Sequence, residues 1–192
     1  KTNVAVSIDP RKASVAKAAV KSGAALVNDV SGLTFDPDLA PFCAEEDLPV
    51  CVMHSQGLPE VMQDMPLYED VVLDVYDFLE TQINHLIGQG IGRNRIIADP
   101  GIGFGKTMAH NLALLNRVSL FHSLGVPLLL GVSRKGFIGK ITQENVAEAR
   151  VIGSVSAALT CLSQGVQIFR VHDVRETRQA FDMWQTIMFG IK

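Results

Sequence analysis

Asp99 is the side chain in this sequence whose surroundings most clearly indicate chemistry. It lies in the stretch Ile96 to Lys106, IIADPGIGFGK, where an apolar run ends in a carboxylate and meets a glycine-rich turn. Pro100 disfavours helical backbone at the preceding residue, so Asp99 is expected at the carboxyl end of a strand. The glycines that follow leave a loop with little bulk, in which the backbone can take unusual dihedral angles or approach a ligand closely. A carboxylate beside such a loop is a candidate floor for a small polar ligand.

Two interpretations of the Asp99 carboxylate stay open at this point. It can simply accept hydrogen bonds from its own glycine turn. Alternatively, its two oxygens can accept from two adjacent N–H donors, as a carboxylate does with a guanidinium. Pterins and guanines carry such a pair of donors on one edge of the ring.

A nucleotide P-loop is the nearest alternative for the same stretch. Gly105, Lys106 and Thr107 match the end of the P-loop pattern, but its first glycine would fall on Pro100, so the match fails. Lys106 is therefore not expected to bind phosphate.

Polar side chains also end the other apolar runs. Ser133 and Lys135 are two residues apart and should share a face, whereas Arg134 should point away and form a structural ion pair. Arg170 and His172 are spaced in the same way. Because buried cations are costly without an anionic partner, Lys135, Arg170 and His172 together indicate a phosphate or pyrophosphate site.

Asp9, Asn28 and His54 each have competing interpretations. Asp9 can be a site carboxylate, but Asp followed by Pro10 also has the form of a helix N-cap. Asn28 offers a donor and an acceptor, which a structural hydrogen bond at a strand end would equally use. A lone histidine such as His54 is commonly a satisfied, partly buried side chain. Asp29 should point to the opposite side from Asn28 and is expected to be structural.

Strands and helices are expected to alternate along the chain. The strands should be continuous apolar runs, as in a parallel sheet covered on both faces, over 3–8, 25–30, 49–54, 95–99, 127–132 and 166–172. Helical spacing and capping residues indicate helices over 11–21, 36–46, 71–88, 112–121 and 146–163, and a last one after 173. Asp173 and Glu176 should form an acidic capping box for the last helix, which Phe181 and Trp184 should pack onto the rest. The segment 55–68 is longer than a simple connection needs and is expected to be a functional loop.

This order predicts an α/β fold with a parallel sheet. Polar residues at nearly every strand end favour a closed barrel, with its site at the carboxyl-end face, over an open doubly wound sheet. Six strands cannot close an eight-stranded TIM (β/α)8 barrel, and an apolar strand is under way almost directly after Lys1. We therefore expect a single barrel domain over 1–192, truncated to about six βα units with the first two upstream of Lys1.

Composition narrows the functional class. The chain has 192 residues, of which 47% are hydrophobic and 19% charged, so it can bury a real core. A net charge of -3 and a pI near 5.9 argue against an extended nucleic-acid surface. No stretch has the length of a membrane span, and we expect no signal peptide. Cys43, Cys51 and Cys161 lack C-x-x-C spacing and indicate reduced thiols in a cytoplasmic protein, and the histidines do not have the spacing of metal ligands.

Taken together, the motifs resemble those of the dihydropteroate synthases, the pterin-binding TIM-barrel enzymes of folate biosynthesis that sulfonamides inhibit. The resemblance spans essentially the whole chain and follows the family's order. Its motifs are SID at 7–9, NDV at 28–30, MH-QG-P at 53–59, DPG-GFGK at 99–106, SRK at 133–135 and RVHDV at 170–174.

The resemblance implies a reaction and a role for each matching residue. The enzymes condense 6-hydroxymethyl-7,8-dihydropterin pyrophosphate with p-aminobenzoate, giving 7,8-dihydropteroate and pyrophosphate. The family pattern implies that a pterin is held by Asp9, Asn28, Asp99 and Lys135, of which Asp9, Asp99 and Lys135 are the catalytic residues. It further implies that the pterin slot is lined by Met53 and Gly131, the p-aminobenzoate side by Phe104 and Ser133, and the pyrophosphate site by Arg170 and His172. It also implies Mg2+, whose main protein contact lies outside this chain, and a cytoplasmic homodimer that binds neither nucleic acid nor membrane.

The sequence also departs from the family pattern. The family's opening strand and the two loops after it are absent here, Pro10 replaces a usual threonine, and Gly136 stands where a larger residue is common. Two alternatives therefore stay open: a catalytically incomplete pterin-binding fragment, and the methyltetrahydrofolate domain of a corrinoid methyltransferase. The methyltransferase domain would not need the basic side chains of the SRK and RVHDV motifs.

Overall fold

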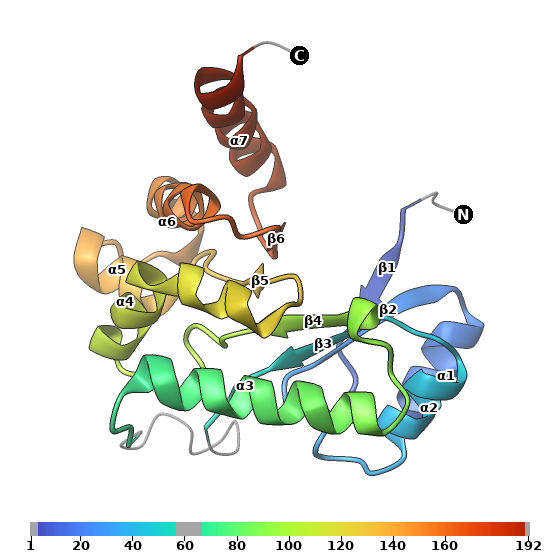
Figure 1. Ribbon diagram of the computed structural model, residues 1–192. Helices are drawn as coiled ribbons and strands as arrows, with labels where there is room; N and C mark the ends of the chain where they lie inside the picture. The colour runs from blue at the N-terminus through green and yellow to red at the C-terminus, as the bar shows by residue number, and fades with distance from the viewer. Residues whose placement is uncertain (1–3, 57–66, 191–192) are drawn as a thin grey trace.

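Parallel strands and helices alternate along the chain in the computed structural model, which describes residues 4–56 and 67–190 (Figure 1). The strands are β1 (Val6–Ile8), β2 (Ala24–Asp29), β3 (Val50–Met53), β4 (Ile96–Asp99), β5 (Leu129–Leu130) and β6 (Ile168–Phe169). The first four form one parallel sheet in the order β1-β2-β3-β4, and β5 pairs with β6 in parallel. A parallel bridge between Ala98 and Leu128 joins the two sets, so the strands follow one another in chain order.

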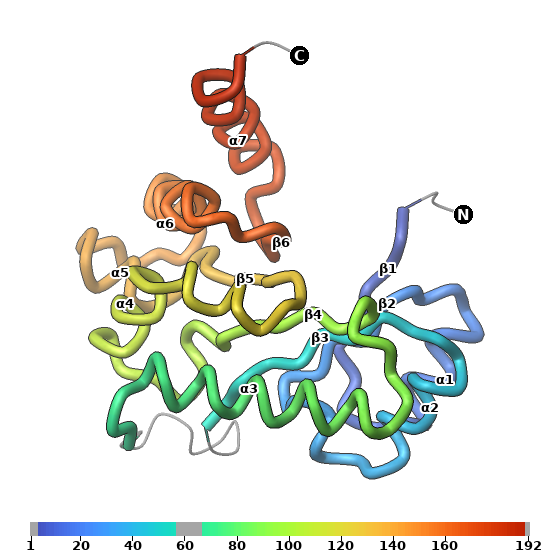
Figure 2. Tube along the Cα trace, viewed as in Figure 1, coloured from blue at the N-terminus to red at the C-terminus, as the bar shows by residue number. Residues whose placement is uncertain are grey.

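Helices separate the strands and cover the outside of this wall. They are α1 (Ala13–Lys21), α2 (Leu39–Glu45), α3 (Val71–Gly88), α4 (Met108–Asn116), α5 (Gly136–Thr142), α6 (Val151–Ser163) and α7 (Val174–Phe189). Short 3-10 helices add η1 (Arg93–Arg95), η2 (Val118–Leu124) and η3 (Ala147–Ala149). β1 and α7, the first and last elements, extend to the far side of the sheet from α3 (Figure 2).

The core explains why the apolar runs become strands. Val27, Val50, Val52, Ala98 and Leu128 are fully buried because helices pack against one side of the wall and neighbouring strands close the rest. Since every strand runs in the same direction, all carboxyl ends lie along one edge. The predicted α/β fold with parallel strands in chain order, as in the wall of a TIM barrel, is confirmed.

Several element boundaries differ from the sequence prediction. The strands expected over 127–132 and 166–172 pair over two residues each. The helix expected over 146–163 is divided into η3 and α6, and α5 was not predicted. The helix expected around 112–121 likewise changes from α4 to η2.

The helix starts differ from the sequence expectations at Asp9, Asp36 and Asp173. α1 begins at Ala13 rather than after Pro10, and the N–H of Ala13 donates to Asp36 at 2.7 Å, so Asp9 caps nothing. Asp36 was expected to open the second helix, which begins at Leu39 instead. Asp173 makes no side-chain cap for α7, because its carboxylate pairs with Arg134.

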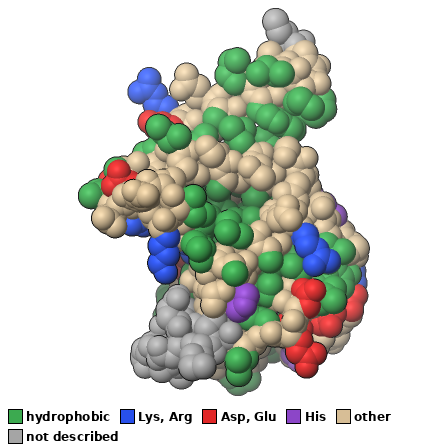
Figure 3. Space-filling view, turned by 90° about the vertical axis from the view of Figure 1, so that its left-hand side faces the viewer, with side chains coloured by type: hydrophobic (Ala, Val, Ile, Leu, Met, Phe, Trp, Pro, Cys, Tyr) green, Lys and Arg blue, Asp and Glu red, His purple; other side chains and the backbone are tan. Residues whose placement is uncertain are grey.

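α7 projects from the rest of the molecule, and it carries several exposed apolar side chains (Figures 1 and 3). Phe181 packs on Phe169 with ring centroids 4.8 Å apart, as expected. The ring of Trp184 is half-buried and contacts Phe189 of the same helix. In the part of the chain that the structure describes, no helix is long and apolar enough to cross a membrane, and the cysteines are buried free thiols, as expected.

Candidate active site

A cavity of about 140 Å3 opens at the carboxyl ends of the strands. Its lining contains every residue that the sequence assigned to a substrate: Asp9, Asn28, Met53, Asp99, Phe104, Gly131, Ser133, Lys135, Arg170 and His172. Val30 and Ile102 complete it. The parallel wall brings these side chains together from all six strand ends, although the chain separates the first from the last by more than half its length.

Burial divides the cavity into a floor and a rim. Asn28, Met53, Asp99 and Ser133 are buried and form the floor. Asp9, Arg170 and His172 are exposed at the mouth and form the rim. A ligand with a flat polar ring and a charged tail matches this division, since the ring can fill the floor while the tail stays near solvent.

Asp99 is the buried carboxylate of the floor. Its Oδ1 accepts the N–H of Gly101 at 2.7 Å, so the expected bond to its own glycine turn is present. Each carboxylate oxygen has two acceptor sites, which leaves capacity for a pair of ligand donors. Burial raises the pKa of Asp99 to about 6, and the Gly101 N–H, Lys135, Lys106 and Arg170 partly oppose this rise. A ligand that offers two N–H groups would favour the ionised form.

Asp9 and Asn28 are bound to each other rather than to the backbone. The amide of Asn28 donates to Oδ1 of Asp9 at 2.9 Å, and Arg170 donates to Oδ2 of Asp9 at 3.0 Å. This chain of contacts joins the floor to the cationic rim. Asp29 points the other way, as predicted, and accepts hydrogen bonds from Ser31 and Leu33.

The loops after β5 and β6 are tied to each other. Arg134 lies between Ser133 and Lys135, has a left-handed backbone with φ of 59°, and makes a two-pronged ion pair with Asp173 at 2.6 and 3.1 Å. This confirms the structural ion pair expected for Arg134. Ser133 accepts the N–H of His172 at 3.2 Å, and its Oγ lies 3.0 Å from the His172 ring nitrogen Nδ1.

Lys135 lies over the floor. Its ammonium is 4.2 Å from the centroid of the Phe104 ring, which is a favourable place for a cation. Burial and the nearby Arg170 lower the pKa of Lys135, whereas Asp99 raises it. Lys135 therefore has a carboxylate and an aromatic ring within its surroundings, and an anionic ligand would stabilise its charge further.

The glycine loop 101–105 serves a different purpose from the one that the sequence suggested. Gly101, Gly103 and Gly105 all have positive φ, as expected of such a loop. The open sides of Gly101 and Gly105, however, face the backbone that follows β3. A Cβ on Gly101 would lie 1.8 Å from the carbonyl oxygen of His54, and one on Gly105 would lie 2.4 Å from that of Gln56. Gly101 and Gly105 therefore admit the backbone that follows β3, whereas a Cβ on Gly103 would lie 3.2 Å from the ammonium of Lys135.

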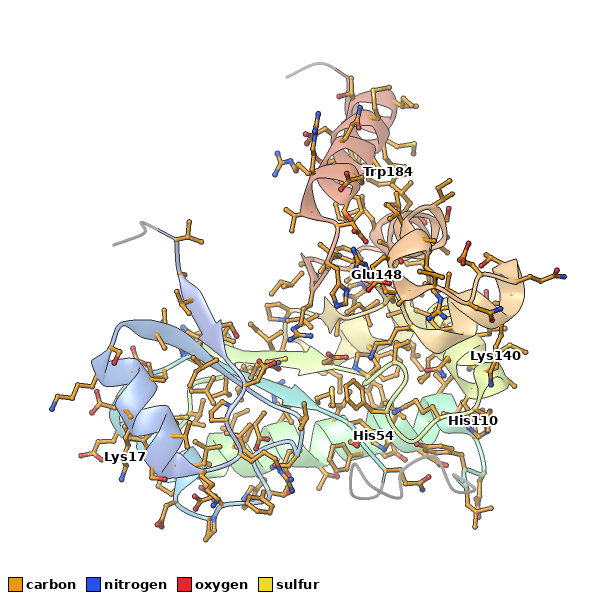
Figure 4. All side chains as sticks on the ribbon, turned by 180° about the vertical axis from the view of Figure 1, so that it is seen from behind. Lys17, His54, His110, Lys140, Glu148 and Trp184 are labelled. Carbon is orange, nitrogen blue, oxygen red and sulfur yellow. The ribbon has the colours of Figure 1, made fainter. Side chains whose placement is uncertain are left out.

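His54 is the strand-end residue that does not reach the cavity. It lies between the sheet and α3, where its ring meets that of Phe78 edge-on at 4.9 Å (Figure 4). Its Nδ1 lies 2.8 Å from the ammonium of Lys106. His54 is thus a buried, satisfied side chain, and Lys106 faces it instead of the phosphate end. Most of the predicted functional loop, with Gly57 and Pro59 of the MH-QG-P motif, falls outside the described residues.

Val30 and Ile102 are lining residues that sequence reasoning did not assign. Each follows a polar strand end by two or three positions, after Asn28 and Asp99 respectively. That spacing is the signal that could have identified them, since both lie in loops that leave the same face. Their apolar side chains suit the surface of a flat ring.

The described residues do not form a Mg2+ site of their own. Within 4–56 and 67–190, no three His, Cys, Asp or Glu side chains are grouped as metal ligands would be. Both cavity carboxylates, on Asp9 and Asp99, already accept hydrogen bonds from the protein.

The structure thus has a parallel barrel wall, with a buried carboxylate on the cavity floor and an Asp9–Arg170 ion pair at its mouth. Comparison with known proteins agrees with this architecture. A family model described as "Pterin binding enzyme" matches residues 1–172, and the chain belongs to this family.

Relatives and solved structures in this family are similar over nearly the whole chain. The dihydropteroate synthase of Escherichia coli K12 is 41% identical over 175 residues, which are 91% of this chain and 61% of that protein. The Xanthomonas albilineans dihydropteroate synthase solved with 4-aminobenzoic acid has a TM-score of 0.92 at 40% identity, covering 98% of this chain and 66% of that one. The structure of the same enzyme with 7,8-dihydropteroate has a TM-score of 0.91 at 39% identity, and the match covers 98% of this chain and 68% of that one. The chain thus spans 61% of the length of its E. coli relative.

Proposed function

We propose that this protein is a dihydropteroate synthase of folate biosynthesis, which condenses 6-hydroxymethyl-7,8-dihydropterin pyrophosphate with p-aminobenzoate. The observation that carries the proposal is the union, in one cavity, of the buried Asp99 floor and the Lys135, Arg170 and His172 cations. The floor suits the N–H edge of a pterin, and the cations suit a pyrophosphate. Relatives of the same family are named for this activity.

The reaction needs little covalent chemistry from the protein. The bond between the exocyclic carbon of the pterin and the pyrophosphate oxygen breaks, and pyrophosphate leaves with both electrons of that bond. The amine nitrogen of p-aminobenzoate forms the new bond to the same carbon and then loses a proton. Positioning and charge stabilisation can carry such a displacement without a covalent enzyme intermediate.

The side chains of the cavity have matching tasks. Asp99 and Asn28 hold the pterin edge, and Asp99 stabilises positive charge that develops on the ring as pyrophosphate leaves. Lys135, above the floor, orients the ring and lies toward the leaving group. Arg170 and His172 at the rim receive the pyrophosphate. Phe104 and Ser133 lie on the side from which p-aminobenzoate enters.

The cationic rim argues against the methyltetrahydrofolate alternative. A methyl-transfer domain needs the pterin floor but has no pyrophosphate to stabilise. Arg170 and His172 project from the end of β6, and Lys135 follows β5, so two cations and an imidazole face one cavity, a set of donors that suits an anionic group.

Product formation tests the proposal. The protein is incubated with both substrates, and dihydropteroate is measured beside the Asp99→Ala and Lys135→Ala variants. Lys21→Ala, on the exposed side of α1, is the control. We expect product from the wild type and the control and its loss from both site variants. Pterin binding without product would support the pterin-binding fragment, and full activity of the Asp99→Ala protein would refute the assignment.

The proposal extends to assembly and compartment. α7 exposes Val174, Met183, Ile187, Met188 and Phe189, an apolar set that a second copy of the chain could cover. We expect a homodimer by sedimentation analysis, and a monomer for the Ile187→Glu variant. The buried free thiols agree with a cytoplasmic location.

A further inference from the structure

Lys106 is a buried cation that the proposed chemistry does not use. Its side chain is 3% exposed. The ammonium lies 2.8 Å from Nδ1 of His54, 3.0 Å from the carbonyl oxygen of Phe104 and 3.4 Å from that of His54. An ammonium has three N–H groups, so this set of acceptors matches the charged form of the side chain.

The same contacts determine the protonation state and tautomer of His54. An ammonium on Lys106 can only donate to Nδ1, which assigns the ring proton of His54 to Nε2 in that state. Burial, with Lys106 beside the ring, lowers the pKa of His54 to about 3. His54 is therefore neutral throughout the range in which enzymes work, and it can accept from Lys106 wherever that side chain is an ammonium.

Lys106 connects two strand ends that build the cavity. His54 directly follows β3, whereas Phe104 belongs to the glycine loop after β4. The loop packs so closely on the backbone of His54 that only glycine fits at Gly101. Asn111 holds the other side of the loop by accepting the N–H of Gly103 at 2.7 Å. The loop that carries Phe104 into the cavity is thus held from both sides.

Lys106 also lies close behind the Asp99 floor. The N–H of Gly101 donates to Asp99, and the Cβ position on Gly101 is 3.4 Å from the Lys106 ammonium. Asp99 is 6% exposed, so little solvent separates the two charges. The positive charge lowers the pKa of Asp99 against the effect of burial, and Asp99 in turn raises that of Lys106.

We propose that Lys106, with His54 as its acceptor, is a positioning residue for the pterin site: it fixes the glycine loop and keeps Asp99 in the ionised form that accepts the pterin N–H groups. The identity of the ligand rests on the proposed function, whereas the effect on Asp99 does not. The other charged groups around Asp99 are Lys135 after β5 and Arg170 after β6, and both remain in every variant below.

A titration without ligand tests the electrostatic part. The 13C resonance of the Asp99 carboxyl, assigned with Asp99→Asn, is followed from pH 4 to 9 in the wild type and in Lys106→Gln, which keeps a donor but removes the charge. Lys21→Gln is the matched control. We expect the Asp99 midpoint near pH 6 in the wild type and the control, and about one pH unit higher in Lys106→Gln. An unchanged midpoint in Lys106→Gln would overturn the proposal.

Affinity for 6-hydroxymethylpterin tests the positioning part. If Lys106 acts through the charge of Asp99, the dissociation constant of Lys106→Gln should rise about fivefold at pH 6 and by less than about twofold at pH 8. A loss that is equal at both pH values would indicate a merely structural role. If the wild type binds no pterin, the proposed function fails, but the ligand-free titration still decides the role of Lys106.

The wild type supplies a measurement that needs no variant. The 15N resonance of the Lys106 side chain should titrate below the usual range for lysine, since burial lowers the pKa of Lys106 to about 7. It should still report an ammonium at the pH where Asp99 ionises. A neutral Lys106 amine at that pH would contradict the proposal, even if the Lys106→Gln protein failed to fold.

Discussion

Arg170 and Asp9 form an ion pair across the mouth of the cavity, with 3.0 Å between nitrogen and oxygen, although 161 residues separate them in the chain. Asp9 follows β1 and Arg170 follows β6, the two outermost strands. The pair therefore joins both ends of the strand wall at the point where the proposed pyrophosphate would lie.

Removing Arg170 should affect ligand binding and not folding. Both side chains of the pair are more than one-third exposed, at 64% and 41%, and exposed pairs contribute at most about 1 kcal/mol to stability. We predict that Arg170→Met lowers the affinity for inorganic pyrophosphate at least about tenfold by calorimetry, with an almost unchanged melting temperature. Arg178→Met, which breaks the exposed α7 pair with Asp182, is the control and should leave pyrophosphate binding intact. Equal losses in both variants would contradict a specific role for Arg170.

Asp99 should make pterin binding depend on pH. Only the ionised carboxylate can accept two N–H groups, and burial raises the pKa of Asp99 to about 6. The dissociation constant for 6-hydroxymethylpterin should therefore increase about tenfold for each pH unit below 6 and become constant above about pH 7. A profile that is flat between pH 5 and 7 would show that Asp99 does not hold the ligand in its ionised form.

The same carboxylate should reduce the stability of the free protein. Its folded pKa of about 6 lies above the ordinary 3.8, so the folded state binds more protons between these values. Protonated Asp99 therefore stabilises the folded state. This contribution is fully present below pH 3.8 and is lost as the pH rises through 6. Asp99→Asn keeps an acceptor for Gly101 and avoids this loss, so it should raise the free energy of unfolding at pH 7 by about 1 to 3 kcal/mol. Denaturant unfolding at pH 4 and pH 7 measures the difference, which should nearly vanish at pH 4.

The glycines of the site should divide into two groups. Gly101 has φ of +70°, and an added Cβ would meet the carbonyl of His54, so Gly101→Ala should destabilise the protein by at least about 2 kcal/mol. Gly131 has open space around its Cβ position and lines the cavity. Gly131→Ala should fold normally and bind pterin more weakly. Normal stability of Gly101→Ala would contradict the close backbone contact.

The Arg134 and Asp173 pair should act on ligand binding from outside the cavity. It holds the loop of Ser133 and Lys135 against the loop of His172, and neither partner lines the cavity. Asp173→Asn should therefore weaken pyrophosphate binding roughly tenfold through misplaced cations. Glu176→Gln, on the first turn of α7, is the control. Unchanged binding in Asp173→Asn would show that the loops are fixed by other contacts.

The strand-end residues could be predicted from the sequence because parallel strands share one direction. Once the apolar runs were recognised, their polar ends had to meet, and the structure does bring Asp9, Asn28, Asp99 and Lys135 together. The roles of these residues on a substrate stay predictions. The sequence also indicated the Arg134 ion pair, since the residue between two site residues must point away.

Three features could not be predicted from the sequence, because each depends on a contact between distant segments: the cap of α1, the packing of the glycine loop, and the Lys106–His54 contact. Asp36 caps α1 from beyond β2, so the local signal at Asp9 and Pro10 was misleading. The glycine loop resembled a ligand loop, but its partner is the backbone after His54, which no pattern within 96–106 encodes. The pairing of Lys106 with His54 likewise crosses 52 residues and depends on how the ends of β3 and β4 are aligned.

The most direct test of the account is a calorimetric titration of the wild type and of Asp99→Asn with 6-hydroxymethylpterin at pH 7.5. If the buried carboxylate is the floor of a pterin site, the wild type should bind one equivalent, and the variant should bind roughly a hundredfold more weakly while remaining folded. Equal affinities in the two proteins, or no binding by the wild type, would contradict the assignment of Asp99 as the floor of a pterin site.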